Sequence, residues 1–227
     1  MSWGDLTQFL LIVHSPVFQS VVQRMSYPTD SLDFSKPWQF SDVVLVVEKD
    51  RFHVHRNILG MWSEVFTTMF TSGFKEKTAR DVPLPGKISS QIKEMLLVIY
   101  PTSAKPINQE NYGFLLDLAK EYMMANLTRK CEMFLMNVLE KLPHGPTRNA
   151  LGCLDILGTA HHYGLGVLES ACIEKAKGLS LHRLRSDGWK IPIATREVIL
   201  HGRIQMLEER ARQCGECCQY VFPEFIR

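Results

Sequence analysis

Along the chain, apolar residues are spaced first as in strands and then as in helices. The run from Val43 to Val47 is short, continuous and rich in β-branched residues, which is typical of a buried strand. Phe52 and Val54 alternate with polar residues after a charged turn, and this predicts the second strand of a hairpin. Val82 and Leu84 stand next to prolines, which predicts a short strand near a sheet edge.

From Asn57 onward the apolar positions recur every three or four residues, as on one face of a helix. A single helix is predicted there, continuing until Ser72 and Gly73 end it. Further helices are predicted at about residues 88–99, 115–122, 131–142, 154–160, 165–172 and 195–214. Gly164 and Gly166 separate two of these helices, which predicts a helical hairpin. Because strands precede helices instead of alternating with them, we expect an α+β fold.

The run Pro-His-Gly-Pro at residues 143–146 predicts a boundary within the chain. The expected parts are a leader of unassigned role at residues 1–37, an α+β domain at 38–142, a short all-α extension at 147–212 and a cysteine-containing tail at 213–227. The apolar segment 9–13 lacks a basic flank and a small-residue cleavage site, which argues against a signal peptide. No window of 18 uninterrupted apolar residues occurs, which argues against a transmembrane helix.

Composition and charge are those of an ordinary globular protein. Of the 227 residues, 45% are hydrophobic and 22% are charged, unlike a disordered chain. The formal net charge of +2 gives no long-range field to draw in nucleic acid or an anionic membrane, so neither is expected as a partner. Cys131, Cys153 and Cys172 lie singly in helical apolar patterns, which indicates buried free thiols in a reducing compartment. We therefore expect an intracellular protein, cytoplasmic or nuclear.

Three motifs follow one another between residues 40 and 76. They are Phe40-Ser41-Asp42-Val43-x-Leu45-x-Val47, Phe52-x-Val54-His55-Arg56 and Leu59-x-x-Trp62-Ser63-x-x-Phe66-x-x-Met69-Phe70-x-x-x-Phe74-x-Glu76. In this order and spacing they closely resemble the BTB/POZ domain family. The resemblance extends to about residues 35–142 through Leu115-x-x-Leu118-Ala119-x-x-Tyr122, Leu127, Cys131 and Phe134-Leu135.

Two neighbouring segments resemble particular members of this family. Residues 99–107 are similar to the BTB domains of MATH–BTB proteins, although the 37 residues before the domain are too few to build a MATH β-sandwich. Residues 147–212 resemble, more weakly, the 3-box and BACK-like helices that follow BTB domains in cullin-3 adaptors.

The resemblance implies a BTB/POZ fold, in which helical hairpins cover a small sheet, and it implies a homodimer. Helices that are apolar over more than one face give an independent physical reason for such association. Phe74 and Glu76 match the hydrophobic-x-Glu motif through which BTB adaptors engage cullin-3, and Tyr122 matches a second cullin contact. Three further positions match residues that are structural or lie near the dimer interface in this family: Asp42, His55 and Arg56.

These assignments have structural alternatives. Phe74 would, in the alternative, fold back onto its own core and leave a solvated loop. Tyr122 fits the apolar face of its helix equally well, so core packing is as good an interpretation as cullin contact. Asp42 and Arg56 would form either a buried ion pair, which is costly to break, or bonds to local backbone groups only.

The chemically reactive residues form no recognisable catalytic or metal site. Cys214-x-x-Cys217-Cys218 has ligand-like spacing, but a zinc site needs a fourth ligand and usually a second motif. Ordinary thiols, an oxidation-sensitive tail and a zinc site are the alternatives for it. The histidines form no HExxH pair, and the sequence contains no phosphate-binding loop or nucleophile elbow. We therefore expect neither an enzyme nor a cofactor.

Together these features predict a protein-interaction module. We expect a homodimeric adaptor that brings an unknown substrate protein to a cullin-3 ubiquitin ligase, with dimerisation adding multivalency. Two alternatives remain open. The first is a non-degradative scaffold or a transcriptional corepressor-binding protein, which the absence of DNA-binding motifs weakens. The second is a tetramer of the potassium-channel T1 type, which the resemblance to the longer, dimeric BTB type disfavours.

Overall fold

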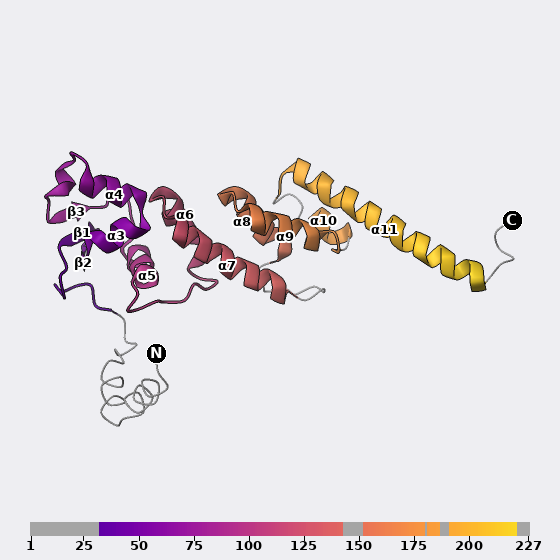
Figure 1. Ribbon diagram of the computed structural model, residues 1–227, viewed down its shortest axis with the longest axis horizontal. Coiled ribbons are helices and arrows are strands. Elements are labelled where there is room, and N and C mark those ends of the chain that lie inside the picture. The colour runs from indigo at the N-terminus through magenta and orange to yellow at the C-terminus, as the bar shows by residue number, and fades with distance from the viewer. Residues whose placement is uncertain (1–31, 143–151, 180, 187–190, 222–227) are drawn as a thin grey trace, which may run out of the picture. The chain divides into compact units, whose positions relative to one another are not determined.

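The computed structural model describes residues 32–142, 152–179, 181–186 and 191–221 (Figure 1). These residues belong to two compact units, one ending at Met124 and the other beginning at Ala125. The predicted boundary at residues 143–146 and nearly all of the predicted leader lie outside the described residues. The predictions made for those segments therefore stay predictions.

A three-stranded sheet lies in the first unit. Its strands are β1 (Val43–Val47), β2 (Asp50–Val54) and β3 (Asp81–Pro83). The central strand β1 pairs antiparallel with β2 and parallel with β3. Leu45 stands opposite Phe52 in one register and Val82 in the other, and all three side chains are buried. The predicted hairpin, the predicted edge strand and the α+β class are thus confirmed.

The two edges of the sheet are occupied in different ways. On the β2 side, the backbone N–H of His53 donates to the Phe34 carbonyl at 2.7 Å. Trp38 Nε1 donates to the His53 carbonyl at 2.8 Å, so both backbone groups of His53 are used. On the β3 side, the strand is only three residues long and contains Pro83, which has no N–H to donate.

The other regular elements described in the first unit are helices. They are α3 (Arg56–Trp62), α4 (Glu64–Thr71), the 3₁₀ segment η1 (Lys75–Lys77), α5 (Ser89–Ile99) and α6 (Tyr112–Glu121). The consecutive residues from Met95 to Ile99 are all buried, so the second half of α5 has no polar face and lies inside the unit.

The prediction of a single helix from Asn57 to Ser72 was wrong. Ser63, with φ −136° and ψ 122°, is extended; it ends α3 and caps α4. Its Oγ accepts a hydrogen bond from the Phe66 N–H at 3.0 Å and donates one to the Tyr122 carbonyl at 2.6 Å. Because the second bond goes to the carbonyl of a residue 59 positions along the chain, a tertiary contact accompanies this break.

The second unit is helical throughout its described residues. It comprises α7 (Ala125–Lys141), α8 (Cys153–Tyr163), α9 (Gly166–Ala176), α10 (Leu181–Ser186) and α11 (Ile193–Val221). The predicted hairpin of α8 and α9 is confirmed: Gly164 ends α8 with φ 68°, a conformation that favours glycine. Lys175 Nζ donates to the Leu139 carbonyl at 2.5 Å, which joins α9 to α7.

The structure thus groups α7 with the helices that follow it. The predicted domain bounds of 38–142 and 147–212 stay a prediction. Across the described ranges, none of the helices combines the length and the apolarity that a membrane span requires.

Candidate partner-binding groove

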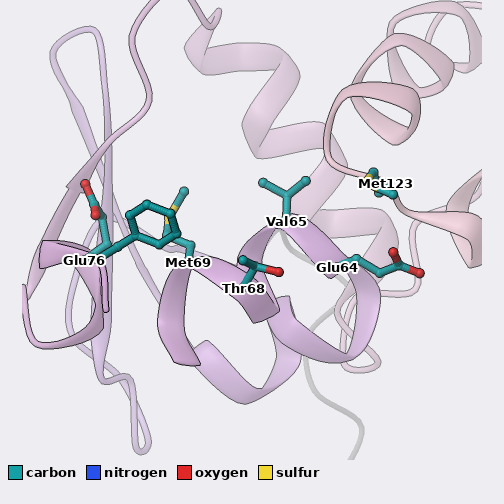
Figure 2. Close-up of a pocket in the computed structure, with 7 residues that line it drawn as sticks. Glu64, Val65, Thr68, Met69, Glu76 and Met123 are labelled. Atoms are coloured by element: carbon teal, nitrogen blue, oxygen red, sulfur yellow. The ribbon is translucent and has the colours of Figure 1, made fainter. Parts of the chain in front are cut away.

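The first unit carries a surface groove beside α4, with a volume of about 490 Å³ (Figure 2). We call it the α4 groove and define it by the residues that line it: Glu64, Val65, Thr68, Met69, Phe74, Glu76 and Met123. In Figure 2, Val65, Thr68 and Met69 lie between Glu76 at one end and Met123 at the other. The lining is therefore largely apolar, with a carboxylate from Glu64 and another from Glu76.

One face of α4 forms the wall of this groove. Glu64, Val65, Thr68 and Met69 stand at positions i, i+1, i+4 and i+5, which share a helix face. Phe66 points the other way and is fully buried. α4 thus packs against the core through the face that carries Phe66, and its opposite face lines the groove.

Phe74 and Glu76 come together in the α4 groove, as the hydrophobic-x-Glu motif predicted. The Phe74 side chain is 58% exposed, so the alternative in which it folds back onto its own core does not describe this structure. Glu76 is half-buried and lies in the first turn of η1. Whether these two residues contact cullin-3 stays a prediction.

Met123 is a groove residue that sequence reasoning missed. It follows the end of α6 with φ 52°, in the left-handed region that favours glycine or asparagine. Its side chain is nevertheless apolar and 55% exposed. A left-handed conformation costs a non-glycine residue roughly 1–2 kcal/mol, so the chain carries strain at the point where this methionine faces the groove. The sequence does not predict this positive φ, because a left-handed residue is expected at glycine or asparagine and not at methionine.

Arg56 connects the start of α3 to the loop that carries the motif. Its Nη1 donates to the carbonyls of Glu76 at 2.9 Å and Lys77 at 3.0 Å, and its Nη2 donates to the Ala79 carbonyl at 2.5 Å. The guanidinium carbon also lies 4.8 Å from the centre of the Phe70 ring, a cation–π contact. One half-buried side chain therefore holds most of the turn around η1.

Asp42 does not form the buried ion pair with Arg56 that the sequence left open. The Asp42 side chain is exposed, and its Oδ1 accepts from the backbone N–H of Arg56 at 2.9 Å. Its effect is to satisfy one of the free N–H groups at the start of α3. Of the two interpretations, bonding to backbone groups is the one observed, and it applies to both residues.

His55 lies in an aromatic cluster that also contains Phe34, Trp38 and Tyr100. Its Nε2 lies 2.6 Å from the Gln39 carbonyl, which can only accept, so Nε2 carries the proton. Nδ1, 3.1 Å from the Tyr100 hydroxyl, is then the acceptor in the neutral ring. Both ring nitrogens are thus used in holding the fold, and a place for His55 in a dimer interface stays a prediction.

Tyr122 is placed in the core and not among the residues that line the groove. It is 5% exposed and stacks on Phe66, with ring centres 4.9 Å apart and an angle of 9° between the rings. Burial raises the pKa of its hydroxyl to about 12. Core packing, one of the two interpretations of this residue, describes its side chain, and a contact with cullin-3 stays a prediction.

The remaining reactive side chains have structural surroundings. Cys131, Cys153 and Cys172 are buried free thiols, as predicted. Burial raises the pKa of Cys131 to about 12, which suppresses the thiolate. The side chains of the Cys214, Cys217 and Cys218 cluster lie outside the described residues. Among the side chains that are described, no group of three or more potential ligands could hold a metal ion.

An apolar groove with carboxylates suits the binding of a protein surface. Comparison with known families gives the decisive observation: the family model described as the BTB/POZ domain matches residues 31–139. Residues 31–139 are a BTB/POZ domain. The match contains every residue of the α4 groove and reaches nearly to the end of α7. The predicted BTB/POZ fold is thus confirmed.

Several curated proteins are similar to this BTB chain. BTB and MATH domain-containing protein 38 of Caenorhabditis elegans is 31% identical over 188 residues, which cover 79% of this chain and 45% of that protein. BTB and MATH domain-containing protein 36 of the same organism is 27% identical over 196 residues, covering 85% and 55%. Kelch repeat and BTB domain-containing protein 8 of Xenopus tropicalis is 28% identical over 127 residues, covering 56% and 19%.

The chain thus spans about half the length of the two MATH-containing relatives. BTB/POZ domains serve as protein-interaction modules, and this is the class of function that the family gives to the chain.

Proposed function

We propose that this protein is a homodimeric adaptor that binds cullin-3 through the α4 groove and brings a substrate protein to the ubiquitin ligase. The observation that carries this proposal is the joint presentation of Phe74 and Glu76 in one groove, where the aromatic ring is 58% exposed. A matched pair of an apolar anchor and a carboxylate is what a specific protein contact uses.

The groove suits a helical or extended segment that presents apolar side chains and at least one basic residue. Val65, Met69, Phe74 and Met123 supply the apolar surface, and the carboxylates of Glu64 and Glu76 would attract the basic residue. A cavity of about 490 Å³ accommodates several partner side chains. Burying such side chains supplies the affinity, while the carboxylates set the orientation and the association rate.

The homodimer is supported by other exposed apolar residues of the first unit. Phe40 is 94% exposed and Met61 is 79% exposed, and neither lines the groove. Two copies that bury these residues against each other would leave the α4 groove free for cullin-3. We also propose that residues 147–212 form BACK-like helices and that the protein binds an unknown substrate protein. The adaptor would then act by raising the effective concentration of that substrate near the ligase.

The proposal is tested with purified protein and the N-terminal domain of cullin-3. Glu76→Lys is expected to abolish co-purification, because it puts a cation where the partner's basic residue would bind, while light scattering still reports a dimer. Lys75→Glu is the matched control: it reverses a charge one residue away, at a position that does not line the groove. Binding that survives Glu76→Lys would overturn the cullin assignment, and a monomeric wild type would overturn the dimer.

A further inference from the structure

Arg56 does not line the α4 groove, yet it contacts the segment that gives the groove its motif. We call residues 74–79 the motif loop. Within this loop, Lys77 N–H donates to the Phe74 carbonyl at 3.1 Å and Ala79 N–H donates to the Lys75 carbonyl at 3.2 Å. Such a short turn has little stability of its own, because short 3₁₀ segments have poor hydrogen-bond geometry.

The bonds from Arg56 come from outside the loop and converge on it. Three carbonyls, those of Glu76, Lys77 and Ala79, accept from a single guanidinium. The planar fork of arginine can reach three acceptors at once, whereas the ammonium of lysine is a compact point charge on a flexible stem. The loop is therefore shaped around this arginine.

The position of Arg56 is itself fixed from two directions. Asp42 Oδ1 holds its backbone N–H at 2.9 Å, and the Phe70 ring of α4 lies against its guanidinium. None of the ion pairs among the described residues involves Arg56, so carbonyl dipoles and one ring face compensate its charge. The contacts that hold the loop are therefore the same contacts that compensate the charge of the half-buried guanidinium.

We propose that Arg56 is the positioning residue of the α4 groove: it holds the motif loop in the shape that presents Phe74 and Glu76 to a partner. Without it, the loop samples other shapes and must be ordered at the moment of binding, which lowers affinity without removing any contact residue. The identity of the partner rests on the proposed cullin-3 function, but the ordering of the loop does not.

The first experiment measures backbone amide hydrogen exchange of the full chain, with no partner present. Arg56→Gln keeps a polar side chain but shortens it by two bonds and removes the charge and the fork. We expect exchange at the amides of Lys77 and Ala79 to rise at least tenfold, while the amides of β1 and α5 keep their protection. Arg51→Gln is the matched control, since it removes an exposed ion pair to Asp81 and releases none of the three carbonyls. Unchanged exchange in the motif loop would overturn the proposal.

The second experiment measures binding of the cullin-3 N-terminal domain by titration calorimetry. Arg56→Gln is expected to weaken binding about tenfold and Arg56→Lys by less. In a Phe74→Ala/Glu76→Ala background, the same Arg56→Gln change is expected to cost less than twofold, because the residues it positions are gone. Equal losses in both backgrounds would show a general structural effect and overturn the positioning role.

The outcomes separate the two proposals. If the wild type does not bind cullin-3, the proposed function fails, and the exchange result alone then decides the role of Arg56. If Arg56→Gln does not fold, as judged by its circular dichroism and thermal melt, Arg56→Lys carries both measurements. Wild-type exchange in the loop of that variant, together with wild-type affinity, would overturn the proposal.

Discussion

The hydroxyl of Tyr100 accepts a hydrogen bond from the backbone N–H of His55 at 2.9 Å and donates one to its ring Nδ1. Tyr100 follows α5 directly, and His55 stands immediately before α3, so one phenol joins the ends of two helices. The ring is also fully buried, and burial raises the pKa of the hydroxyl above its ordinary value of 10.0. The hydroxyl therefore stays protonated and able to donate.

Removing this hydroxyl is expected to destabilise the fold. Tyr100→Phe leaves the His55 N–H and Nδ1 without their partner in a largely buried setting, at a cost of about 1–3 kcal/mol. The free energy of unfolding in urea measures the change. Tyr122→Phe is the control, because the stacked ring and the carbonyl that accepts from Ser63 are both kept. A Tyr100→Phe protein as stable as the wild type would contradict the assignment of these bonds.

Ser63→Ala is expected to lower the free energy of unfolding by about 1–3 kcal/mol. The substitution removes the N-cap of α4 and leaves the Tyr122 carbonyl without its buried donor. Thermal melts followed by circular dichroism give the shift in melting temperature. Ser90→Ala, an exposed position in α5, is the matched control. A shift no larger than that of the control would mean that the break between α3 and α4 does not depend on this side chain.

Substitutions of Met123 are expected to separate stability from binding. Met123→Asn suits the left-handed conformation and should raise the free energy of unfolding by up to about 1 kcal/mol. It also removes an apolar side chain from the groove, so cullin-3 affinity should fall about tenfold, equivalent to about 1.4 kcal/mol.

Met123→Leu is the matched control for this prediction, since it keeps both the strain and an apolar surface and should bind as the wild type does. Calorimetric titration and denaturant unfolding give the two quantities. An Asn variant that gains stability and loses no affinity would remove Met123 from the binding surface.

Stability is expected to fall as the pH rises above about 9. Burial raises the pKa of Cys131 from 9.0 to about 12 and that of Tyr122 from 10.0 to about 12. Unfolded chains lose these protons at lower pH than folded chains, so their contributions are complete below pH 9 and disappear between about pH 9 and 12. Urea unfolding at pH 8, 9, 10 and 11 measures the decline. Cys131→Ala should make the decline shallower between pH 9 and 10, and an unchanged profile would contradict this origin.

The strands and most helices could be predicted from local spacing. Val82 and Phe52 were assigned correctly because β positions alternate regardless of what packs on them. The break at Ser63 could not be predicted, since the apolar period from Leu59 through Trp62 to Phe66 continues across it. At the break, Ser63 Oγ donates to the carbonyl of Tyr122, which lies 59 positions away in the sequence and which no local pattern indicates.

The candidate site was only partly visible in the sequence. Phe74 and Glu76 came from the family motif, and the structure places both in one groove. Met123 was missed because a left-handed methionine has no sequence signal. For Arg56 the sequence left two kinds of partner open, an ion pair or backbone groups. It could not name the carbonyls of residues 76, 77 and 79, because every residue has a carbonyl and carbonyls leave no trace in the sequence.

The way the sheet ends has a consequence for aggregation. A strand adding beside β2 would have to displace the bonds that Phe34 and Trp38 make to the backbone of His53. A strand adding beside β3 would meet a segment of three residues in which Pro83 offers no donor. Growth of the sheet from chain to chain, the route to fibrils, is thus obstructed at both edges. A protein that works by associating with others can therefore expose apolar side chains without exposing an unpaired strand edge to which further chains could add.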